Sequence, residues 1–430
     1  MERMTLNGIY KLKYFDHDTF HIENVMCDNF FPNDWIDANV PEDVHTTLRR
    51  YGYLSGHYYD KDLDQERWID EKDWVYFRSF VADERLYGHA CTLCLEGVDT
   101  LARVWLNGTL LGTCQNMFRE YTFPVGDALL FGQENRLVIQ VLSPLGHTAS
   151  TSKKGIYPED DATRMLLRKS QMNWGWDFCG HCLTVGLWKS IYLKTCDEAA
   201  LSDARLTTET LDAKEAKLHL SCTVQNGSAE DEVEIKLSIH RLTADEARDF
   251  SFTLKEPRPW WPRPYGDPFL YDVCIRLLHG GATVDKKEFH FGLRIVELQQ
   301  NYEDGGRSFL FRINGRRLFL RGAHWGPLHC IYAETRSEDY DPVFARVLDS
   351  NLSMLRIWGG GIYESEHFLD LCDKHGILVF QDMMLACGIF PQDEAFLRLV
   401  YEEVSEVVRR NYNRACIVMW SADNELDEAY

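Results

Sequence analysis

From Phe309 onward, short apolar runs alternate with amphipathic segments in steps of roughly 30 residues. The expected strands are 318–322, 354–357, 377–380 and a last run that starts at 417, and helices are expected between them. Four such steps predict a parallel sheet with helices packed against it. A doubly wound sheet has the same local pattern as half of a (β/α)8 barrel, so the repeat alone leaves both folds open.

The expected helices carry local start and stop signals. Asp341 followed by Pro342 predicts a helix start, because Asp caps the first amides and Pro suits the first turn. Ser365 predicts the start of a second helix and Gly376 its end. A third helix is expected from about 393 to 411, where valines recur on one face.

The residues before this repeat show strand patterns only. Asn107-Gly108 is a strong signal for a two-residue hairpin, and a turn is expected at Asn226-Gly227. Strands are expected at 75–81, 102–106, 137–142, 186–193, 218–224 and 233–239. We predict a jelly-roll β-sandwich for residues 1–195 and an immunoglobulin-like β-sandwich for 196–302. With two sandwiches ahead of it, 303–430 is best explained as the N-terminal half of a (β/α)8 TIM barrel.

Composition narrows the class of protein. The 430 residues carry a formal net charge of −21, and 45% of them are hydrophobic. These values argue against disorder and disfavour binding to nucleic acid or to anionic membranes. No apolar stretch approaches the roughly 20 residues of a membrane span, and the N-terminus lacks the apolar region of a signal peptide. The 13 cysteines, many within apolar patterns, indicate reduced thiols and a cytoplasmic protein, of unknown oligomeric state.

Polar and aromatic residues gather where each expected barrel strand ends. They are His324-Trp325 after the first strand, Trp358 with three glycines after the second, Gln381-Asp382 after the third and Asn424-Glu425 after the fourth. Barrel enzymes carry their catalytic groups at these strand ends. The sequence therefore predicts a site on this rim, with Glu425 as its candidate acid.

Four segments carry a resemblance to a known family. Residues 351–364 and 370–387 closely resemble the β-mannosidase branch of the retaining β-glycosidases of glycoside hydrolase family 2, which also contains β-galactosidases and β-glucuronidases. Residues 417–425 resemble the acid/base strand of the same enzymes. The resemblance implies a hydrolase that acts on terminal, non-reducing β-D-mannose residues with retention.

The resemblance also implies roles for individual residues. Glu425 would protonate the glycosidic oxygen and later deprotonate water, while Asn424 would bind the sugar 2-hydroxyl. Trp358 would line the sugar site. Trp325 and Asp382, at the ends of the first and third expected strands, are further candidates for substrate binding.

Residues 168–178 resemble a first-domain loop that reaches into the active site of β-mannosidases. Trp176 and Asp177 are therefore predicted to bind substrate, and the alternative is a Trp-rich edge of the core. A lone acid between aromatic residues is costly to bury unless something pairs with it, which favours Asp177 as a ligand. The chain departs from the family pattern at Phe178, where Trp is usual, so one indole donor is lost.

A retaining glycosidase needs two carboxylates about 5–5.5 Å apart, and only Glu425 is supplied by the resemblance. Asp423, where the family usually has Asn, is expected to face the same way as Glu425 on an extended strand. We expect the nucleophile on a later strand and this chain to be the amino-terminal part of a longer polypeptide. Residues 1–430 alone are then expected to be inactive.

Two alternatives stay open: a non-catalytic carbohydrate-binding protein, and a related exo-β-glucosaminidase, β-galactosidase or β-glucuronidase. No cofactor and no metal is expected. A redox role for Cys179-x-x-Cys182 is disfavoured because no βαβ unit surrounds it. A zinc site shared with Cys91 and Cys94 is disfavoured because residues three apart on a strand face opposite sides.

Overall fold

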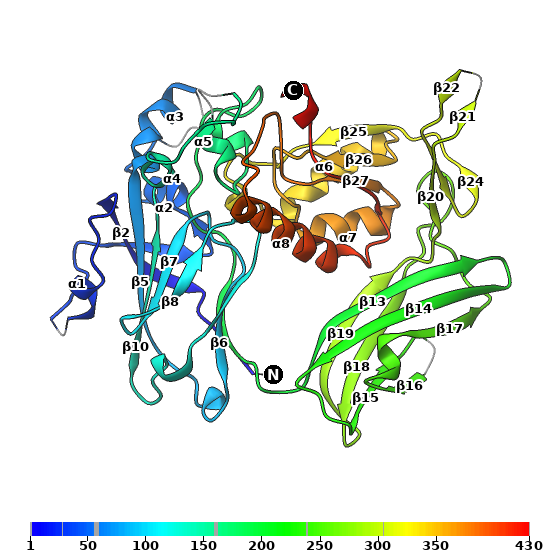
Figure 1. The fold of residues 1–430 in the computed structure, drawn as a ribbon, viewed down its shortest axis with the longest axis horizontal. Coiled ribbons are helices and arrows are strands. Elements are labelled where there is room, and N and C mark those ends of the chain that lie inside the picture. The colour runs from blue at the N-terminus through cyan, green and yellow to red at the C-terminus, as the bar shows by residue number, and fades with distance from the viewer. Residues whose placement is uncertain are drawn as a thin grey trace.

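The computed structural model describes residues 2–27, 29–55, 60–158, 162–237, 240–303 and 305–429. Two β-sandwiches are followed by a parallel sheet with its helices, and the three parts follow one another in chain order (Figure 1). The predicted fold class is confirmed: a jelly-roll sandwich, an immunoglobulin-like sandwich and the first half of a TIM barrel. Among the described residues, no helix has the length and apolar character that a membrane crossing requires.

The first sandwich packs a six-stranded sheet, in the order β3-β2-β5-β10-β7-β8, against a four-stranded sheet, β1-β12-β6-β9. Its strands are β1 (Arg3–Thr5), β2 (Gly8–Asp16), β3 (Ile36–Val40), β4 (Glu42–Asp43), β5 (Lys72–Val81), β6 (Cys91–Leu95), β7 (Ala102–Leu106), β8 (Thr109–Cys114), β9 (Tyr121–Pro124), β10 (Glu134–Val141), β11 (Gly186–Leu187) and β12 (Ile191–Thr195). Its short helices are α1 (Glu23–Met26), α2 (Val44–Arg50), α3 (Asp60–Glu66), α4 (Pro144–Thr148) and α5 (Ala162–Met165). The predicted hairpin at Asn107-Gly108 joins β7 to β8.

The second sandwich packs the sheet β13-β14-β17 against the sheet β16-β15-β18-β19. Its strands are β13 (Ala200–Leu211), β14 (Glu215–Gln225), β15 (Asp231–Ile235), β16 (His240–Thr243), β17 (Phe250–Lys255), β18 (Tyr271–His279) and β19 (Ala282–Phe291). A small connecting region follows, with β20 (Val296–Gln299), β21 (Tyr302–Glu303), β22 (Gly306–Arg307), β23 (Leu310–Ile313) and β24 (Arg316–Arg317). The strand predicted at 233–239 ends at Ile235, and Ser238 and Ile239 lie outside the described residues.

The last part is a parallel sheet in strict chain order: β25 (Gly322–Trp325), β26 (Met354–Ile357), β27 (Leu378–Asp382) and β28 (Ile417–Ser421). Each strand pairs with its predecessor, as in a barrel wall, whereas a doubly wound sheet reverses its strand order. Helices α6 (Ser337–Asp349), α7 (Glu366–His375) and α8 (Glu394–Asn411) share one apolar core with this sheet. The predicted start of α7 at Ser365, its end at Gly376 and the extent of α8 are confirmed.

Three further predicted boundaries are wrong. The first barrel strand begins at Gly322 rather than 318, because Leu318 instead packs with Trp260 below the sheet. Helix α6 begins at Ser337 rather than after Asp341, since the Asp339 carboxylate accepts the Arg336 N–H at 2.7 Å and starts the helix earlier. The single strand predicted at 186–193 is two strands, β11 and β12, which pair with different partners.

The segment around Trp260 connects the second sandwich to the barrel. Trp260 is fully buried, and its indole N–H donates to the Asp373 carbonyl of α7 at 2.9 Å. Gly376, which ends α7, has a φ of 68°, and its carbonyl accepts the Arg263 N–H at 3.0 Å. A Cβ at Gly376 would lie 2.9 Å from the Arg263 nitrogen and 3.0 Å from the Trp261 carbonyl oxygen. The C-terminal end of α7 therefore packs directly against the segment around Trp260.

Gly376→Ala is expected to destabilise the chain more than Gly52→Ala does. Both glycines have positive φ, which costs an alanine about 1–2 kcal/mol, but a Cβ at Gly52 meets nothing within 4 Å. At Gly376 the backbone contact adds to this cost. Thermal unfolding of residues 1–430 checks the prediction, and equal shifts in the two midpoints would contradict it.

Candidate active site

A charged network joins the ends of three barrel strands. Arg356, on β26, donates from Nη2 to Asp382 Oδ2 at 2.8 Å and to Asn424 Oδ1 at 3.0 Å. Asp382 is fully buried and also accepts the Gly359 N–H at 3.1 Å. Burial raises the pKa of Asp382 despite the neighbouring guanidinium. The network holds Asn424, itself 3% exposed, in a fixed orientation at the rim.

Glu425 lies on the exposed side of this network. Cys387 donates from Sγ to Glu425 Oε2 at 3.2 Å, and Asn424 Nδ2 donates to the same sulfur at 3.3 Å. Burial, followed by the hydrogen bond to Glu425, raises the pKa of Cys387 to about 11, so at neutral pH this residue is a thiol that can donate. One cysteine thus links the two side chains that the sequence predicts to act on a sugar.

Three aromatic rings cluster beside these groups. Trp358 is 9% exposed and meets Trp176 edge to face at 5.0 Å and Phe178 at 5.5 Å, measured between ring centroids. Cys387 packs against the same cluster, so the rings lie next to Glu425. Asp177 is exposed, and the argument that its burial calls for a partner therefore does not apply.

The loop that carries Trp176 comes from the first sandwich and is anchored on the barrel by buried charges. Arg168 donates to Glu403 of α8 from Nε at 2.9 Å and from Nη2 at 2.7 Å, and both side chains are fully buried. The Met172 N–H donates to the Gly360 carbonyl at 2.8 Å. The loop is therefore held against the segment that follows β26.

The next residue of the loop faces the other way. Lys169 is 1% exposed, and its ammonium donates to Asp99 Oδ1 at 2.5 Å and to the Thr184 carbonyl at 2.7 Å, both within the first sandwich. Tyr332, from the segment after β25, also donates to Asp99. Arg168 thus binds the barrel, whereas the adjacent Lys169 binds the first sandwich.

Trp325 is placed away from the rim cluster. It is 6% exposed, packs against Phe344 and Phe368 in the helix layer, and donates from its indole N–H to Glu364 at 2.9 Å. Trp325 is therefore part of the core, and this position does not suit the substrate-binding role predicted for it. Its neighbour His324 is exposed.

Asp423 does not face the same way as Glu425 on an extended strand, because β28 ends at Ser421 and Glu425 has a φ of 59°. The Asp423 carboxylate instead accepts the Leu426 N–H at 3.2 Å and caps the 3-10 helix η7 (Leu426–Ala429). Its charge contributes to the raised pKa of Asp382, after burial. The expected orientation of Asp423 is therefore wrong.

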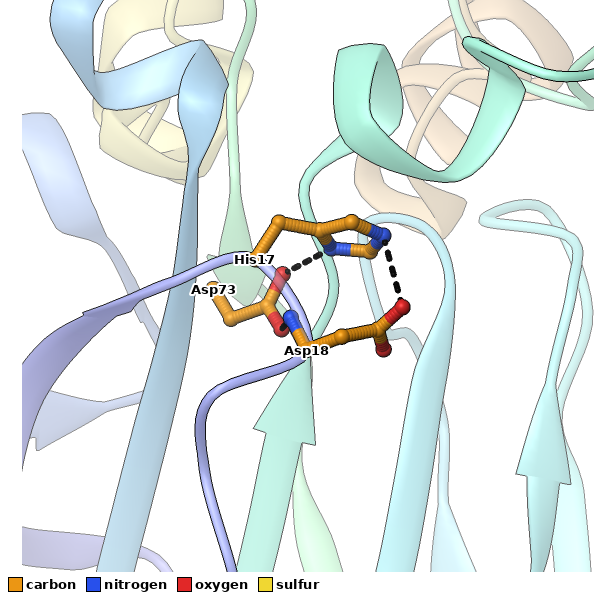
Figure 2. Close-up of side chains that lie close together, drawn as sticks. All are labelled: His17, Asp18 and Asp73. Atoms are coloured by element: carbon orange, nitrogen blue, oxygen red, sulfur yellow. Dashed lines mark hydrogen bonds and ion pairs between the residues drawn. The ribbon is translucent and has the colours of Figure 1, made fainter.

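One group among the described residues has ligand atoms near enough for a metal: His17, Asp18 and Asp73, in the first sandwich (Figure 2). Asp73 is fully buried and accepts hydrogen bonds from His17 Nδ1 at 2.9 Å and from the Asp18 N–H at 3.2 Å. Gln140 and the Ser143 N–H donate to it as well, at 2.9 and 2.8 Å. Since four donors already use its two oxygens, we assign this group a structural role.

A large cleft lies elsewhere. About 1510 Å³ in volume, it is lined by both sandwiches and by α7 and α8, with charges of both signs such as Arg119, Asp272 and Glu402. None of the predicted site residues lines it. We place the candidate site at the strand ends, because the polar and aromatic groups converge there and the cleft holds no comparable arrangement.

Family models match most of the chain. A galactose-binding domain-like model of glycosyl hydrolase family 2 matches residues 20–189, a second family 2 model matches 189–294, and the TIM barrel domain model of the family matches 363–430. The chain belongs to glycoside hydrolase family 2.

Individual relatives agree with this. β-Mannosidase B of Aspergillus terreus is 32% identical over 407 residues, which are 90% of this chain and 48% of that protein. The crystal structure of a β-D-mannosidase from Dictyoglomus thermophilum is 32% identical, with a TM-score of 0.89 over 99% of this chain and 52% of that one. An exo-chitosanase from Amycolatopsis orientalis, 18% identical over 98% of this chain and 49% of its own, shares the fold with a TM-score of 0.73. The chain spans about half the length of the curated relatives it matches.

Sequence reasoning missed Arg356 and Cys387. Arg356 stands in an apolar strand, one residue before Ile357, and a lone charge in such a strand is a signal that it faces a polar site. Cys387 carried no comparable signal. Its contact with Glu425 depends on the loop after β27 pairing with the end of β28, which no local pattern reveals.

Glu403→Gln is expected to destabilise the chain by about 3–5 kcal/mol, because Arg168 would remain buried without its charged partner. Glu394→Gln, on the same helix, is the matched control. Its exposed pair with Arg398 is worth less than about 1 kcal/mol. Urea unfolding followed by tryptophan fluorescence measures both, and a Glu403→Gln shift as small as the control would contradict the anchoring role.

Proposed function

We propose that the chain provides the acid/base half of a retaining β-mannosidase active site, within a longer polypeptide that provides the nucleophile. The observation that carries the proposal is the group of Asn424, Glu425 and Cys387 at the end of β28, beside Trp358 and the loop from the first sandwich. Family membership supports glycoside hydrolysis, and mannose is proposed because the relatives named β-mannosidase are about 30% identical to this chain.

In this mechanism Glu425 donates its proton to the glycosidic oxygen as the bond to the leaving group breaks. It then takes a proton from the water that releases the sugar from the enzyme. Asn424 would donate to the sugar 2-hydroxyl. The rings of Trp358 and Trp176 supply apolar faces on which a pyranose can stack.

Neither of the two described carboxylates at the barrel strand ends beside Glu425 is free to act as the nucleophile. Asp382 is fully buried and bound to Arg356, and Asp423 caps η7. A retaining enzyme needs a second free carboxylate about 5–5.5 Å from Glu425. The proposal therefore requires a further carboxylate from outside residues 1–430.

Glu425→Gln in the longer polypeptide is expected to lower kcat/KM for an unactivated β-mannoside by about 10²–10⁴-fold, because the leaving group loses its acid. For a dinitrophenyl β-mannoside, whose leaving group needs little protonation, the same substitution should lower the rate of the glycosylation step by a smaller factor. Asp427→Asn, an exposed acid two residues away, is the matched control. Hydrolysis of both substrates is followed by absorbance or by sugar release.

Two results would overturn the proposal: unchanged hydrolysis by Glu425→Gln, or substantial turnover by residues 1–430 alone. Sugar binding without hydrolysis, equally tight in the Glu425→Gln variant, would favour the non-catalytic carbohydrate-binding alternative. Comparison of aryl β-mannoside, β-glucosaminide, β-galactoside and β-glucuronide tests the choice of sugar.

Cys387→Ala is expected to lower kcat of the longer polypeptide several-fold, because Glu425 and Asn424 lose their shared partner. The dependence of the rate on pH should also change between acidic and neutral pH. Cys387→Ser keeps a donor of similar size and should retain more activity. Rate–pH profiles of the two variants check this. Identical profiles for alanine and serine would show that the thiol does not position Glu425.

A further inference from the structure

The two cysteines of the Cys179-x-x-Cys182 motif lie in different environments. Cys179 is 6% exposed and packs with Met172 and Trp358, whereas Cys182 is 3% exposed and packs with Leu63 of the first sandwich. The two cysteines of the motif therefore pack in different clusters. Each sulfur has other neighbours.

Cys179 instead belongs to the buried cluster against which Cys330 packs, and each of these two thiols is the main electrostatic neighbour of the other. Cys330 lies on the segment between β25 and α6, so the contact joins the first-sandwich loop to the barrel. Asn173 fixes the two segments beside each other: its Nδ2 donates to the Cys330 carbonyl and its own carbonyl accepts the Cys182 N–H, both at 2.8 Å. The segments that carry Cys179 and Cys330 are thus held beside each other in one cluster.

Cys330 is the more reactive partner. The neighbouring Cys179 thiol lowers the pKa of Cys330, with help from the Ile331 N–H, and Cys330 is half-buried. The Cys330 thiol and burial raise the pKa of Cys179. A lowered pKa favours the thiolate, which is the form of cysteine that reacts with peroxides.

A second pair of thiols shows what distinguishes this one. Cys372 and Cys416 are also neighbours in one cluster, but both are fully buried in the barrel core. Burial raises the pKa of each. Because neither thiol ionises readily or is accessible to solvent, that pair should stay reduced.

We propose that Cys179 and Cys330 are a site of reversible oxidation that forms a disulfide on exposure to hydrogen peroxide. The Cys330 thiolate attacks one peroxide oxygen, so an S–O bond forms, the O–O bond breaks and hydroxide leaves as water after protonation. The Cys179 sulfur then attacks the Cys330 sulfenic acid. The S–S bond forms, the S–O bond breaks, and hydroxide leaves with the Cys179 proton as a second water.

The disulfide would fasten the loop of Trp176, Asp177 and Phe178 covalently to the barrel, next to Trp358. It would add a redox-dependent link to the permanent one between Arg168 and Glu403. A small thiol such as glutathione would reverse it by exchange. The inference concerns the thiols alone and stands whether or not the chain acts on mannosides.

The test is cysteine mapping of residues 1–430 after brief treatment with hydrogen peroxide at pH 7. Remaining thiols are blocked with N-ethylmaleimide, and the protein is digested with trypsin without reduction. Cys179 and Cys182 share the tryptic peptide 170–189, and Cys330 lies in 322–336. The expected product is a cross-link between these two peptides, about 2 Da lighter than their sum.

Variants assign the bond. The cross-link should persist in Cys182→Ser, the matched control three residues from Cys179, and should disappear in Cys330→Ser. A disulfide within peptide 170–189, oxidation of Cys330 without a cross-link, or oxidation of Cys372 and Cys416 at lower peroxide would each overturn the proposal. Wild-type mapping decides among these even if a variant fails to fold.

Discussion

The ion pair between Arg168 and Glu403 fixes how the first sandwich meets the barrel. The Glu403 carboxylate receives both guanidinium donors and, in addition, the Tyr363 hydroxyl at 2.7 Å and the Asn116 amide at 2.7 Å. A buried carboxylate is tolerated only when donors surround it, and these donors come from both domains, so few relative positions of the two domains satisfy Glu403. The ion pair therefore determines how the first sandwich and the barrel are positioned relative to each other. It thereby also determines the position of the loop that carries Trp176.

This docking makes the candidate site composite. Trp358 and Glu425 come from the barrel, whereas Trp176 comes from a sandwich more than 180 residues earlier in the chain. Arg164 adds hydrogen bonds between the first sandwich and the barrel, because its guanidinium donates to the Ala386 carbonyl at 2.9 Å and to the Cys387 carbonyl at 2.5 Å. The loop after β27 is thus held from the sandwich side, and the sulfur that contacts Glu425 is held with it.

Sequence reasoning succeeded where structure depends on neighbouring residues. Helix α7 begins at Ser365 and ends at Gly376 because a side-chain cap and a left-handed glycine are local devices. It failed for Trp325, because a strand that starts four residues later than expected puts that indole inside the strand, on the face toward the helices. The burial of Arg168 was equally hidden, since its partner lies 235 residues away on another domain.

The backbone at Glu425 shows how the rim separates two adjacent side chains. Its φ of 59° costs a non-glycine residue about 1 kcal/mol, and such strain persists only where surrounding bonds impose it. Here the Asn424 N–H donates to the Leu385 carbonyl and the Cys387 N–H donates to the Asn424 carbonyl, both at 2.9 Å. These bonds fix the residue before the bend, so Asn424 stays buried on Arg356 while Glu425 turns outward, where a proton can be exchanged with a bound molecule and with water.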